Sequence, residues 1–507
     1  MTILEKIRHN VQKNGNKPAY SVENGGGGQS ITWQELGDLS GRLAASLHKN
    51  LKSENPIIVY GHKDPYMLVC FLACVKAGRA YCPIDTSVPL NRVEMIIEEV
   101  EPEIVLSTEL LPIEFEKILL KEEILNLIKS QKEVIDTSNY VSSNEVFYII
   151  FTSGSTGKPK GVQITRECLD NFIQWGITLG GLKEGNDYVF LNQAPFSFDL
   201  SVMDLYLCLY LGGTLCALTK KAQQDMRLLL PVLERFLANV WVSTPSFADV
   251  CLSDKKFSET LLPNLTTFLF CGETLTNKTV ERLFGRFPKA NIINLYGPTE
   301  STVAVTDIVV TPEMNRQLSP LPVGKEKPGT WIQIVDDEGN VLPDGKKGEI
   351  IIIGNTVSIG YWKNEELNQK VFGKCKIDGK TYRFYRTGDE GYKKDGLLYY
   401  CGRLDLQIKL HGYRIEVEDI ENNIMKLPGI KQVAVIPKYR GGKISSLAGF
   451  LVLPAGTEDE FLAAQRIREQ LKEYLPDYMI PKKIKFFEQL PMTNNGKVDR
   501  RGLGGLL

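Results

Sequence analysis

The chain has few of the residues and patterns that mark several common protein classes. It has 507 residues and only four histidines, and none of its ten cysteines forms a CxxC pair, so a zinc site is not expected. Lysine and arginine (60 in total) nearly balance aspartate and glutamate (61 in total), so bulk charge favours neither a nucleic-acid partner nor a membrane surface. The longest apolar run, Met67 to Val75, is about half as long as a membrane-spanning helix needs to be.

The start of the chain also lacks the apolar core segment of a secretory signal. Up to Tyr20 it carries several basic residues instead, among them Lys6, Arg8, Lys13 and Lys17. Because no export signal is expected, the scattered cysteines are most simply reduced thiols. We therefore expect a cytoplasmic protein that does not insert into a membrane.

Strand and helix signals alternate through the first part of the chain, whose total length favours two or more domains. Thr32, followed by Glu35 three positions later, predicts a helix N-terminus. Pro65 to Gly78 reads as a helix that starts with proline and ends with glycine. Apolar strands are expected at Ile104–Ser107, Phe147–Phe151, Val189–Leu191, Thr214–Leu218, Val240–Ser243, Thr267–Phe270 and Ile292–Leu295. This alternation is typical of a doubly wound α/β fold.

The pattern changes twice further along the chain. Between about residues 320 and 402, short strands and turn signals predict a small β-rich subdomain. After Gly402, helix and strand signals over about 100 residues predict a smaller α+β domain. We therefore expect an N-terminal core over 1–402, followed by a separate and smaller C-terminal domain.

One loop has the composition of a phosphate-binding segment. Residues 150–161 read Ile-Phe-Thr-Ser-Gly-Ser-Thr-Gly-Lys-Pro-Lys-Gly and follow an apolar strand. Glycines let backbone N–H groups turn onto an anion, hydroxyls add donors, and lysines add positive charge. The spacing is not that of a Walker A loop, and on composition alone a polar surface turn remains the alternative. The candidate nucleotide-binding residues here are Thr152, Ser153, Gly154, Ser155, Thr156 and Lys160.

The order of residues in this loop resembles the phosphate loop of the adenylate-forming enzymes, the superfamily of acyl-CoA synthetases, amino-acid adenylation domains and luciferases. Four further stretches match that family in the same order: 294–300, 385–389, 402–409 and 491–500. Taken singly, each could be a strand-end turn, a linker or a solvated lysine. Their common order over most of the chain is what identifies the chain as similar to this family.

The resemblance implies a nucleotide site. In the family's pattern, Tyr296 would stack on adenine, Thr299 would contact the α-phosphate, and Glu300 would ligate Mg²⁺. A carboxylate in the ribose motif can accept bonds from both ribose hydroxyls. The nucleotide-binding residues implied outside the loop are Asn294, Tyr296, Gly297, Thr299, Asp389, Arg403 and Lys497. ATP and Mg²⁺ are the implied cofactors.

The resemblance also implies a two-step reaction in which the C-terminal domain moves. Asp405 would be the pivot of a hinge at 403–405, which connects the core to a C-terminal domain over 406–507. Arg403, Glu300 and Lys497 would be the catalytic residues. Lys497 would bind both the substrate carboxylate and the α-phosphate region while the carboxylate attacks ATP. A rotation would then withdraw this lysine before a thiol attacks the acyl-AMP.

The substrate is indicated by Asp199, which lies among aromatic residues. In amino-acid-activating members an Asp here pairs with the substrate ammonium, and a buried, unpaired carboxylate would cost several kcal/mol. The alternative is an Asp that caps a helix. Lys497 would hold the substrate carboxylate. Cys271, which follows a predicted strand, would line the same pocket and select the hand of the substrate.

Four stretches are especially similar to the D-alanine-activating members of the family: 192–204, 243–247, 270–273 and 411–414. This likeness implies activation of D-alanine to D-alanyl-AMP and its transfer to the phosphopantetheine thiol of a D-alanyl carrier protein, for teichoic-acid D-alanylation. No nucleic-acid partner is expected. Two alternatives remain: activation of another small amino or acyl acid with transfer to coenzyme A, and a non-catalytic adenylate-binding protein.

Overall fold

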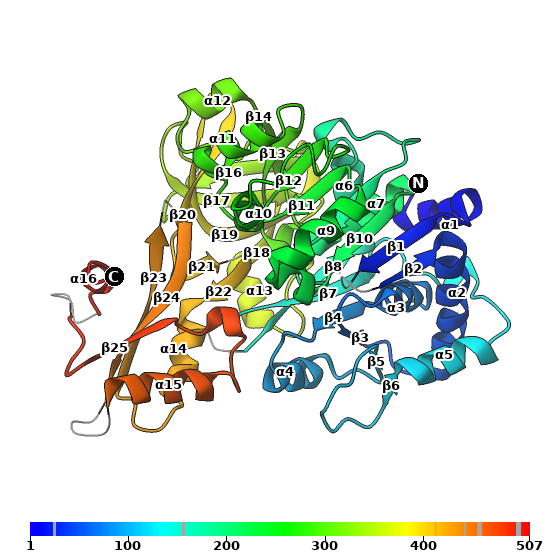
Figure 1. Cartoon of the computed structure of the whole chain (residues 1–507), viewed down its shortest axis with the longest axis horizontal. Helices are drawn as coiled ribbons and strands as arrows, with labels where there is room; N and C mark the ends of the chain where they lie inside the picture. Colours follow the sequence, from blue (N-terminus) through cyan, green and yellow to red (C-terminus); the bar gives the residue numbers. More distant parts are fainter. Residues whose placement is uncertain (24–26, 155–157, 411, 441–442, 454–458, 493–497) are drawn as a thin grey trace. The chain divides into compact units, whose positions relative to one another are not determined.

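A computed structural model of the chain (Figure 1) describes residues 1–23, 27–154, 158–410, 412–440, 443–453, 459–492 and 498–507. The chain divides into two compact units. The first comprises residues 1–85, 100–150 and 161–402, and the second comprises residues 86–99, 151–160 and 403–507. The domain limits expected from the sequence stay a prediction.

The larger sheet of the first unit has nine strands in the order β15-β14-β13-β12-β11-β9-β10-β1-β2. Its middle strands, from β13 to β1, are parallel, and antiparallel strands flank them on both sides. The strands are β1 (Pro18–Glu23), β2 (Gly28–Thr32), β9 (Val189–Asn192), β10 (Thr214–Leu218), β11 (Val240–Ser243), β12 (Thr267–Phe270), β13 (Asn291–Tyr296), β14 (Thr306–Val310) and β15 (Lys325–Glu326). All the strands that the sequence predicted here are confirmed.

A second sheet has six strands in the order β6-β5-β3-β4-β7-β8. They are β3 (Ile57–Gly61), β4 (Tyr81–Asp85), β5 (Val105–Ser107), β6 (Ile118–Leu120), β7 (Val146–Thr152) and β8 (Lys160–Thr165). The predicted strands β5 and β7 are confirmed. β4 was not predicted, although it pairs with both β3 and β7 near the middle of the sheet.

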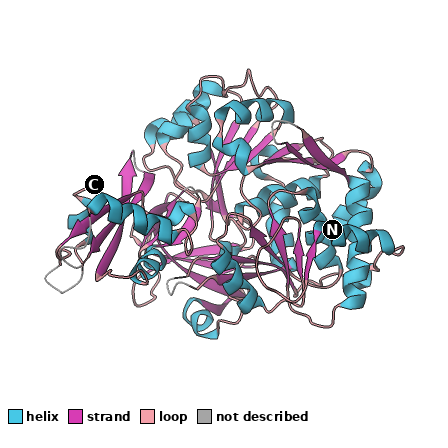
Figure 2. Ribbon diagram, turned by 60° about the horizontal axis from the view of Figure 1, so that its bottom comes forward, coloured by secondary structure: helices cyan, strands magenta, loops and turns pink. Residues whose placement is uncertain are grey.

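Helices cover the sheets of the first unit (Figure 2). They are α1 (Ile3–Asn14), α2 (Trp33–Asn50), α3 (Pro65–Lys76), α5 (Lys121–Ser130), α6 (Arg166–Gly176), α7 (Leu200–Leu211), α8 (Lys220–Gln224), α9 (Met226–Phe236), α10 (Pro245–Leu252), α11 (Asn277–Arg286), α12 (Pro312–Gln317) and α13 (Glu365–Val371). Thr32 and Glu35 form the predicted capping box of α2. No helix in the described part of the chain is both apolar and long enough to cross a bilayer.

Two of these helices are apolar nearly all round, which is the pattern of a helix buried on every side. Every residue of α7 and nearly every residue of α3 is buried. Both helices belong to a hydrophobic core that also contains Phe190 of the nine-stranded sheet and Phe147 of the six-stranded sheet. They therefore join the two sheets into one core.

The predicted β-rich subdomain is confirmed as a five-stranded sheet in which β16, β17, β19 and β18 are neighbours in that order and β20 pairs with β19. The strands are β16 (Thr330–Val335), β17 (Gly348–Gly354), β18 (Phe372–Ile377), β19 (Lys380–Lys394) and β20 (Leu397–Arg403). Ile332 and Ile334 of β16 and Ile350 and Ile352 of β17 alternate along their strands and supply an apolar face.

The second unit is a smaller α+β structure, as predicted. A three-stranded sheet in the order β23-β24-β25 packs with α14 and α15 around a core that includes Ile420, Val435 and Ile467. Its elements are α4 (Leu90–Val100), β21 (Gln407–Leu410), β22 (Tyr413–Glu416), α14 (Val417–Met425), β23 (Gln432–Arg440), β24 (Lys443–Val452), α15 (Glu460–Leu471), β25 (Lys483–Phe487) and α16 (Arg500–Gly504).

Candidate active site

Candidate residues for both the substrate and the nucleotide lie at the carboxyl ends of parallel strands in the nine-stranded sheet. Asp199 ends the loop that leaves β9, Cys271 directly follows β12, and Tyr296 is the last residue of β13. Because β9, β11, β12 and β13 run parallel, these ends meet at one edge of the sheet. Ligands of open α/β sheets bind at this edge.

Asp199 and Thr299 are in direct contact, although they are far apart in sequence. The Thr299 hydroxyl donates a hydrogen bond of 2.6 Å to the Asp199 carboxylate, and both side chains are nearly buried. Asp199 precedes α7 but makes no side-chain cap hydrogen bond to it. The helix-cap alternative for Asp199 is therefore wrong, and its carboxylate faces the turn that carries the predicted nucleotide residues.

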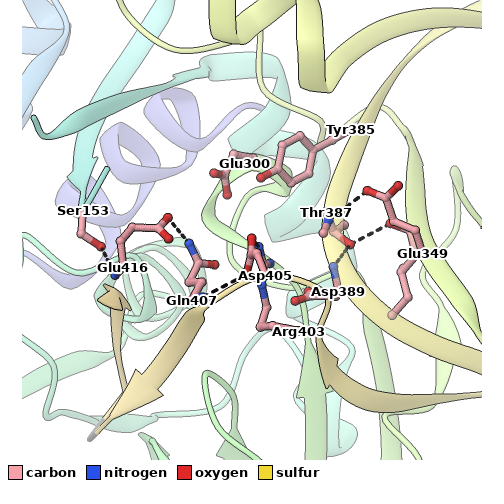
Figure 3. A network of polar contacts seen from close by, with 12 residues as sticks. Ser153, Glu300, Glu349, Tyr385, Thr387, Asp389, Arg403, Asp405, Gln407 and Glu416 are labelled. Carbon is pink, nitrogen blue, oxygen red and sulfur yellow. Dashed lines mark hydrogen bonds and ion pairs between the residues drawn. The ribbon is translucent and has the colours of Figure 1, made fainter. Parts of the chain in front are cut away.

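Tyr296 and Asp389 form a second buried pair. The Tyr296 hydroxyl donates to Asp389 at 2.6 Å, and the backbone N–H of Asp389 donates to Thr387 at 2.9 Å (Figure 3). Burial, followed by the neighbouring Asp389 charge, raises the pKa of Tyr296, so the phenol stays a donor. The predicted adenine residue and the predicted ribose residue thus meet in the fold.

Glu300 is fully buried, and Tyr361 holds it. The Tyr361 hydroxyl donates to the Glu300 carboxylate at 2.6 Å and lies 3.4 Å from the hydroxyl of Tyr385. Mg²⁺ is commonly bound through one or two carboxylates together with substrate phosphates, and a buried Glu that follows the predicted α-phosphate residue Thr299 fits that chemistry. Sequence reasoning missed Tyr361, because nothing in its Gly-Tyr-Trp context marks it as a partner of Glu300.

The backbone after Glu300 is strained. Thr302 and Val303 have φ values of 60° and 69°, a region that β-branched residues rarely adopt. The Thr302 hydroxyl donates to the Thr356 carbonyl at 2.7 Å, and the Cys271 thiol, which is 4 % exposed, donates to the Val303 carbonyl at 3.7 Å. Such strain persists only where surrounding contacts enforce it, and it concentrates at functional sites.

Most of the predicted phosphate loop, residues 151–160, belongs to the second unit. The Thr152 hydroxyl is buried with no hydrogen-bond partner among the described residues, which suits a loop that donates to an anion. A Cβ on Gly154 would lie 2.2 Å from the Lys158 carbonyl oxygen, so only glycine fits there. Ser155 and Thr156 lie outside the described residues.

Two other loop residues contact β22. The Ser153 hydroxyl donates to the Arg414 carbonyl at 2.8 Å and accepts the Glu416 backbone N–H at 3.2 Å (Figure 3). The Lys160 ammonium lies 3.4 Å from the Glu416 carboxylate. Within the second unit, the loop is therefore connected to β22, the second strand after the predicted hinge.

The predicted hinge contains its own ion pair. Arg403 donates to both carboxylate oxygens of Asp405, at 2.9 and 2.5 Å. Burial opposes ionisation of Asp405, but the hydrogen bonds and charge of Arg403 outweigh it and lower the pKa of this carboxyl. The Gln407 backbone N–H also donates to Asp405, at 3.0 Å. Lys497 lies outside the described residues.

This fold and these motifs define an adenylate-forming enzyme. The chain belongs to the AMP-binding enzyme family, whose model matches residues 7–362, and the AMP-binding enzyme C-terminal domain matches residues 419–497. The resemblance seen in the sequence is thereby confirmed.

Relatives with curated names show which members of this family the chain is similar to. The chain is 45 % identical over 511 residues to a D-alanine–D-alanyl carrier protein ligase of Listeria welshimeri, covering 99 % of this chain and 98 % of the relative. It is 46 % identical over 481 residues to the ligase of the same name from Bacillus anthracis, covering 93 % and 94 %.

Solved structures share the fold at lower identity. The Vibrio cholerae adenylation domain AlmE, in complex with glycyl-adenosine-5'-phosphate, matches with a TM-score of 0.84 and 23 % identity over 99 % of this chain and 97 % of that chain. The o-succinylbenzoate CoA synthetase of Bacillus subtilis matches with a TM-score of 0.83 and 20 % identity over 99 % and 98 %. Both support the adenylate-forming fold.

Proposed function

We propose that this chain uses ATP to convert D-alanine to D-alanyl-AMP and pyrophosphate, and then transfers the D-alanyl group to the phosphopantetheine thiol of a D-alanyl carrier protein. The observation that carries the proposal is the 45 % identity, over 99 % of the chain, to a relative named for this reaction. The product would supply teichoic-acid D-alanylation. Because the reaction consumes ATP, we assign it to the cytoplasm.

In the first step a carboxylate oxygen of D-alanine forms a bond to the α-phosphorus of ATP, and the bond from that phosphorus to pyrophosphate breaks. Both reactants are anions, so donors and cations must stabilise the charge that develops. The buried Thr152 hydroxyl and the Lys160 ammonium would donate to phosphate oxygens. Lys497 would contact both reactants, and Glu300 would hold Mg²⁺, which neutralises part of the phosphate charge.

The nucleotide would be held by the buried pair at the end of β13. Asp389 would accept the ribose hydroxyls, and its orientation is fixed by the Tyr296 hydroxyl at 2.6 Å. Adenine would pack on the Tyr296 ring. Thr299 would lie at the α-phosphate while its hydroxyl holds Asp199, which links the nucleotide to the amino-acid pocket.

The ammonium of D-alanine would pair with Asp199. This carboxylate is 9 % exposed, and a buried carboxylate is stabilised by a cationic partner. Fatty-acyl and aryl substrates offer no such cation. An amino acid is therefore the substrate class that a carboxylate in this position favours.

ATP–pyrophosphate exchange tests the first step. The chain would be assayed with D-alanine, L-alanine, glycine and propionate, and the D-alanine-dependent rate should be the highest. Transfer would then be measured to a phosphopantetheinylated carrier protein and to coenzyme A. Exchange with propionate alone, or transfer only to coenzyme A, would refute the proposal, and no exchange with any acid would indicate a nucleotide-binding protein.

A further inference from the structure

Lys63 is a buried lysine in an unusual backbone position. It lies two residues beyond the end of β3, is 1 % exposed, and has a φ of 56°. The Tyr20 hydroxyl donates to its carbonyl oxygen at 2.8 Å. Left-handed backbone at a residue other than glycine costs on the order of 1–3 kcal/mol, so the surroundings must hold Lys63 in place.

The Lys63 ammonium reaches the loop that leads to Asp199. It donates to the Asn192 side-chain oxygen and to the Ala194 carbonyl, and it lies 4.6 Å from the centroid of the Phe196 ring. Asn192 is the last residue of β9, and Ala194 and Phe196 lie in the loop that follows. One ammonium therefore holds the start of the loop and its middle.

The same contacts reach the helix beyond the loop. The Asn192 side-chain N–H donates to the Asp204 carboxylate of α7 at 2.8 Å. The loop is also bonded internally, because the Phe198 N–H donates to the Pro195 carbonyl at 3.0 Å and the Ser201 hydroxyl donates to the Phe198 carbonyl at 2.7 Å. A shift at Ala194 would thus be passed along the loop to Asp199.

Lys63 and Asp204, the two ionisable groups of this network, stabilise each other's charged form. Burial lowers the pKa of Lys63 to about 8, although Asp204 and Asp85 favour its charged form. Burial raises the pKa of Asp204, and Lys63 opposes that shift. Each charge therefore offsets part of the other's desolvation through the amide of Asn192.

From these contacts we infer that Lys63 is a positioning residue for the amino-acid site: through Asn192, Ala194 and Phe196 it fixes the 193–199 loop and so sets the place of Asp199. The inference rests on the proposed function, in which Asp199 binds the substrate ammonium. Lys63 itself contacts no reacting atom in this account.

A second buried lysine provides a matched control. Lys76, the last residue of α3, is 7 % exposed, and burial lowers its pKa to about 8 as well. Its ammonium donates to the Ser40 hydroxyl at 2.7 Å and to the Gly37 carbonyl at 3.4 Å, both in α2. Lys76 therefore shares the burial of Lys63 without its contacts to the loop.

The experiment compares Lys63→Met and Lys76→Met in the full chain by thermal unfolding and ATP–pyrophosphate exchange. Misplacement by about 1 Å can reduce rates on the order of 10²-fold, so we expect Lys63→Met to raise KM for D-alanine by about 10- to 100-fold. KM for ATP should stay within about twofold, and Lys76→Met should leave both values unchanged. Equal increases in both KM values, or an unchanged KM for D-alanine, would overturn the inference.

The double variant Lys63→Met/Asp204→Asn separates positioning from stability. It removes both buried charges, so Tm should recover towards that of the wild type while KM for D-alanine stays raised. Recovery of KM together with Tm would show that Lys63 is only structural. If Lys63→Met alone does not fold, the double variant is compared with the wild type instead, and a raised KM for D-alanine with an unchanged KM for ATP is again the expected result.

The wild-type assay distinguishes this inference from the proposed function. If the wild type activates another amino acid in place of D-alanine, the proposed substrate is wrong, and the variants are then assayed with the acid that the wild type uses. A selective rise in KM for that acid still supports Lys63 as a positioning residue, and an unchanged KM refutes it.

Discussion

Three carboxylates of the candidate site each accept a hydrogen bond from a neighbouring hydroxyl. Thr299 holds Asp199, Tyr296 holds Asp389, and Tyr361 holds Glu300, each at 2.6 Å. Hydrogen bonds to a charged acceptor are short and strong, and a carboxylate can accept at several positions. One hydroxyl can therefore orient each carboxylate before a ligand arrives.

Removing the Tyr361 hydroxyl that orients Glu300 should weaken the binding of Mg²⁺ in the exchange reaction. Hydrogen bonds to charged groups contribute about 1.5–3 kcal/mol, so Tyr361→Phe should raise the Mg²⁺ concentration for half-maximal exchange roughly 10- to 100-fold. Tyr382→Phe is the control, because the Tyr382 ring packs on Trp331 at 4.8 Å. Identical Mg²⁺ titrations for wild type and Tyr361→Phe would contradict the assignment of Glu300.

Cys271 should limit the use of L-alanine. With the ammonium and carboxylate of the substrate held, exchanging hand swaps the hydrogen and methyl positions at Cα, and a one-methyl misfit is worth roughly 10- to 200-fold in kcat/KM. Cys271→Gly should therefore raise kcat/KM for L-alanine towards the D-alanine value. The measurement is exchange with each isomer, and a constant D/L ratio would assign selectivity to another wall of the pocket.

Burial of Lys76 should make stability depend on alkaline pH. Its pKa is lowered to about 8, below the value of about 10.4 for a free lysine, so the unfolded chain binds more protons between these values. Its contribution to the free energy of unfolding is fully present above pH 10.4 and falls by about 1.4 kcal/mol per pH unit as the pH falls towards 8. The Tm of the wild type, relative to the Tm of Lys76→Met, should therefore rise from pH 8 to pH 10. If the difference between the two Tm values does not change with pH, the lowered pKa of Lys76 is contradicted.

At the scale of elements, the predicted hinge is the segment most open to test. Asp405 accepts bonds from Arg403 and from the Gln407 N–H, and a pivot there needs a large dihedral change that proline forbids. Asp405→Pro should keep pyrophosphate exchange and lose transfer to the carrier thiol. Asp405→Ala removes the same carboxylate without fixing φ, so it should keep both steps. Equal transfer rates for the two variants would place the pivot elsewhere.

Helices with capping residues and strands made of apolar runs were predictable from the sequence, whereas a strand that contains a proline was not. Capping residues located α2, and apolar runs located the strands of the nine-stranded sheet. β4 was missed because Pro83 lacks an N–H group and favours sheet edges, yet it lies opposite Val59 in the sheet.

Motif order identified the candidate site residues, but it could not predict their partners. The contact between Tyr361 and Glu300 joins residues 61 positions apart, and no periodic signal links them. The same holds for Lys63 and Asn192, which are 129 positions apart. Such contacts depend on how the sheets and their connecting loops pack, which local sequence patterns do not encode.

At the scale of the whole molecule, the candidate residues are distributed over both units. Asp199, Cys271, Glu300 and Asp389 belong to the first, and Arg403 and the 151–160 loop belong to the second. The expected reaction has two half-reactions, and each can be assayed separately. Substitution of a residue that acts in only one half-reaction should therefore lower the rate of that half-reaction more than the rate of the other.

Lys497→Ala should be such a case. Loss of one charge-assisted contact to a developing anion typically costs ~10²–10³ in rate, so adenylation should fall at least that far. Transfer from presynthesised D-alanyl-AMP to the carrier thiol should be spared. Equal loss of both half-reactions would refute the assignment of Lys497 to the first step alone.

The parallel pairing of β1 with β10 has a consequence for how the protein is made. Residues 20–23 pair with residues 215–218, so β1 and its hairpin partner β2 leave the ribosome long before β10, the neighbour on the other side, exists. At roughly 5–20 residues per second, that delay is on the order of 10–40 s. Until β10 emerges, the apolar side of β1 and its edge towards β10 stay uncovered, so a nascent chain stalled before β10 should expose a surface of the kind that chaperones bind.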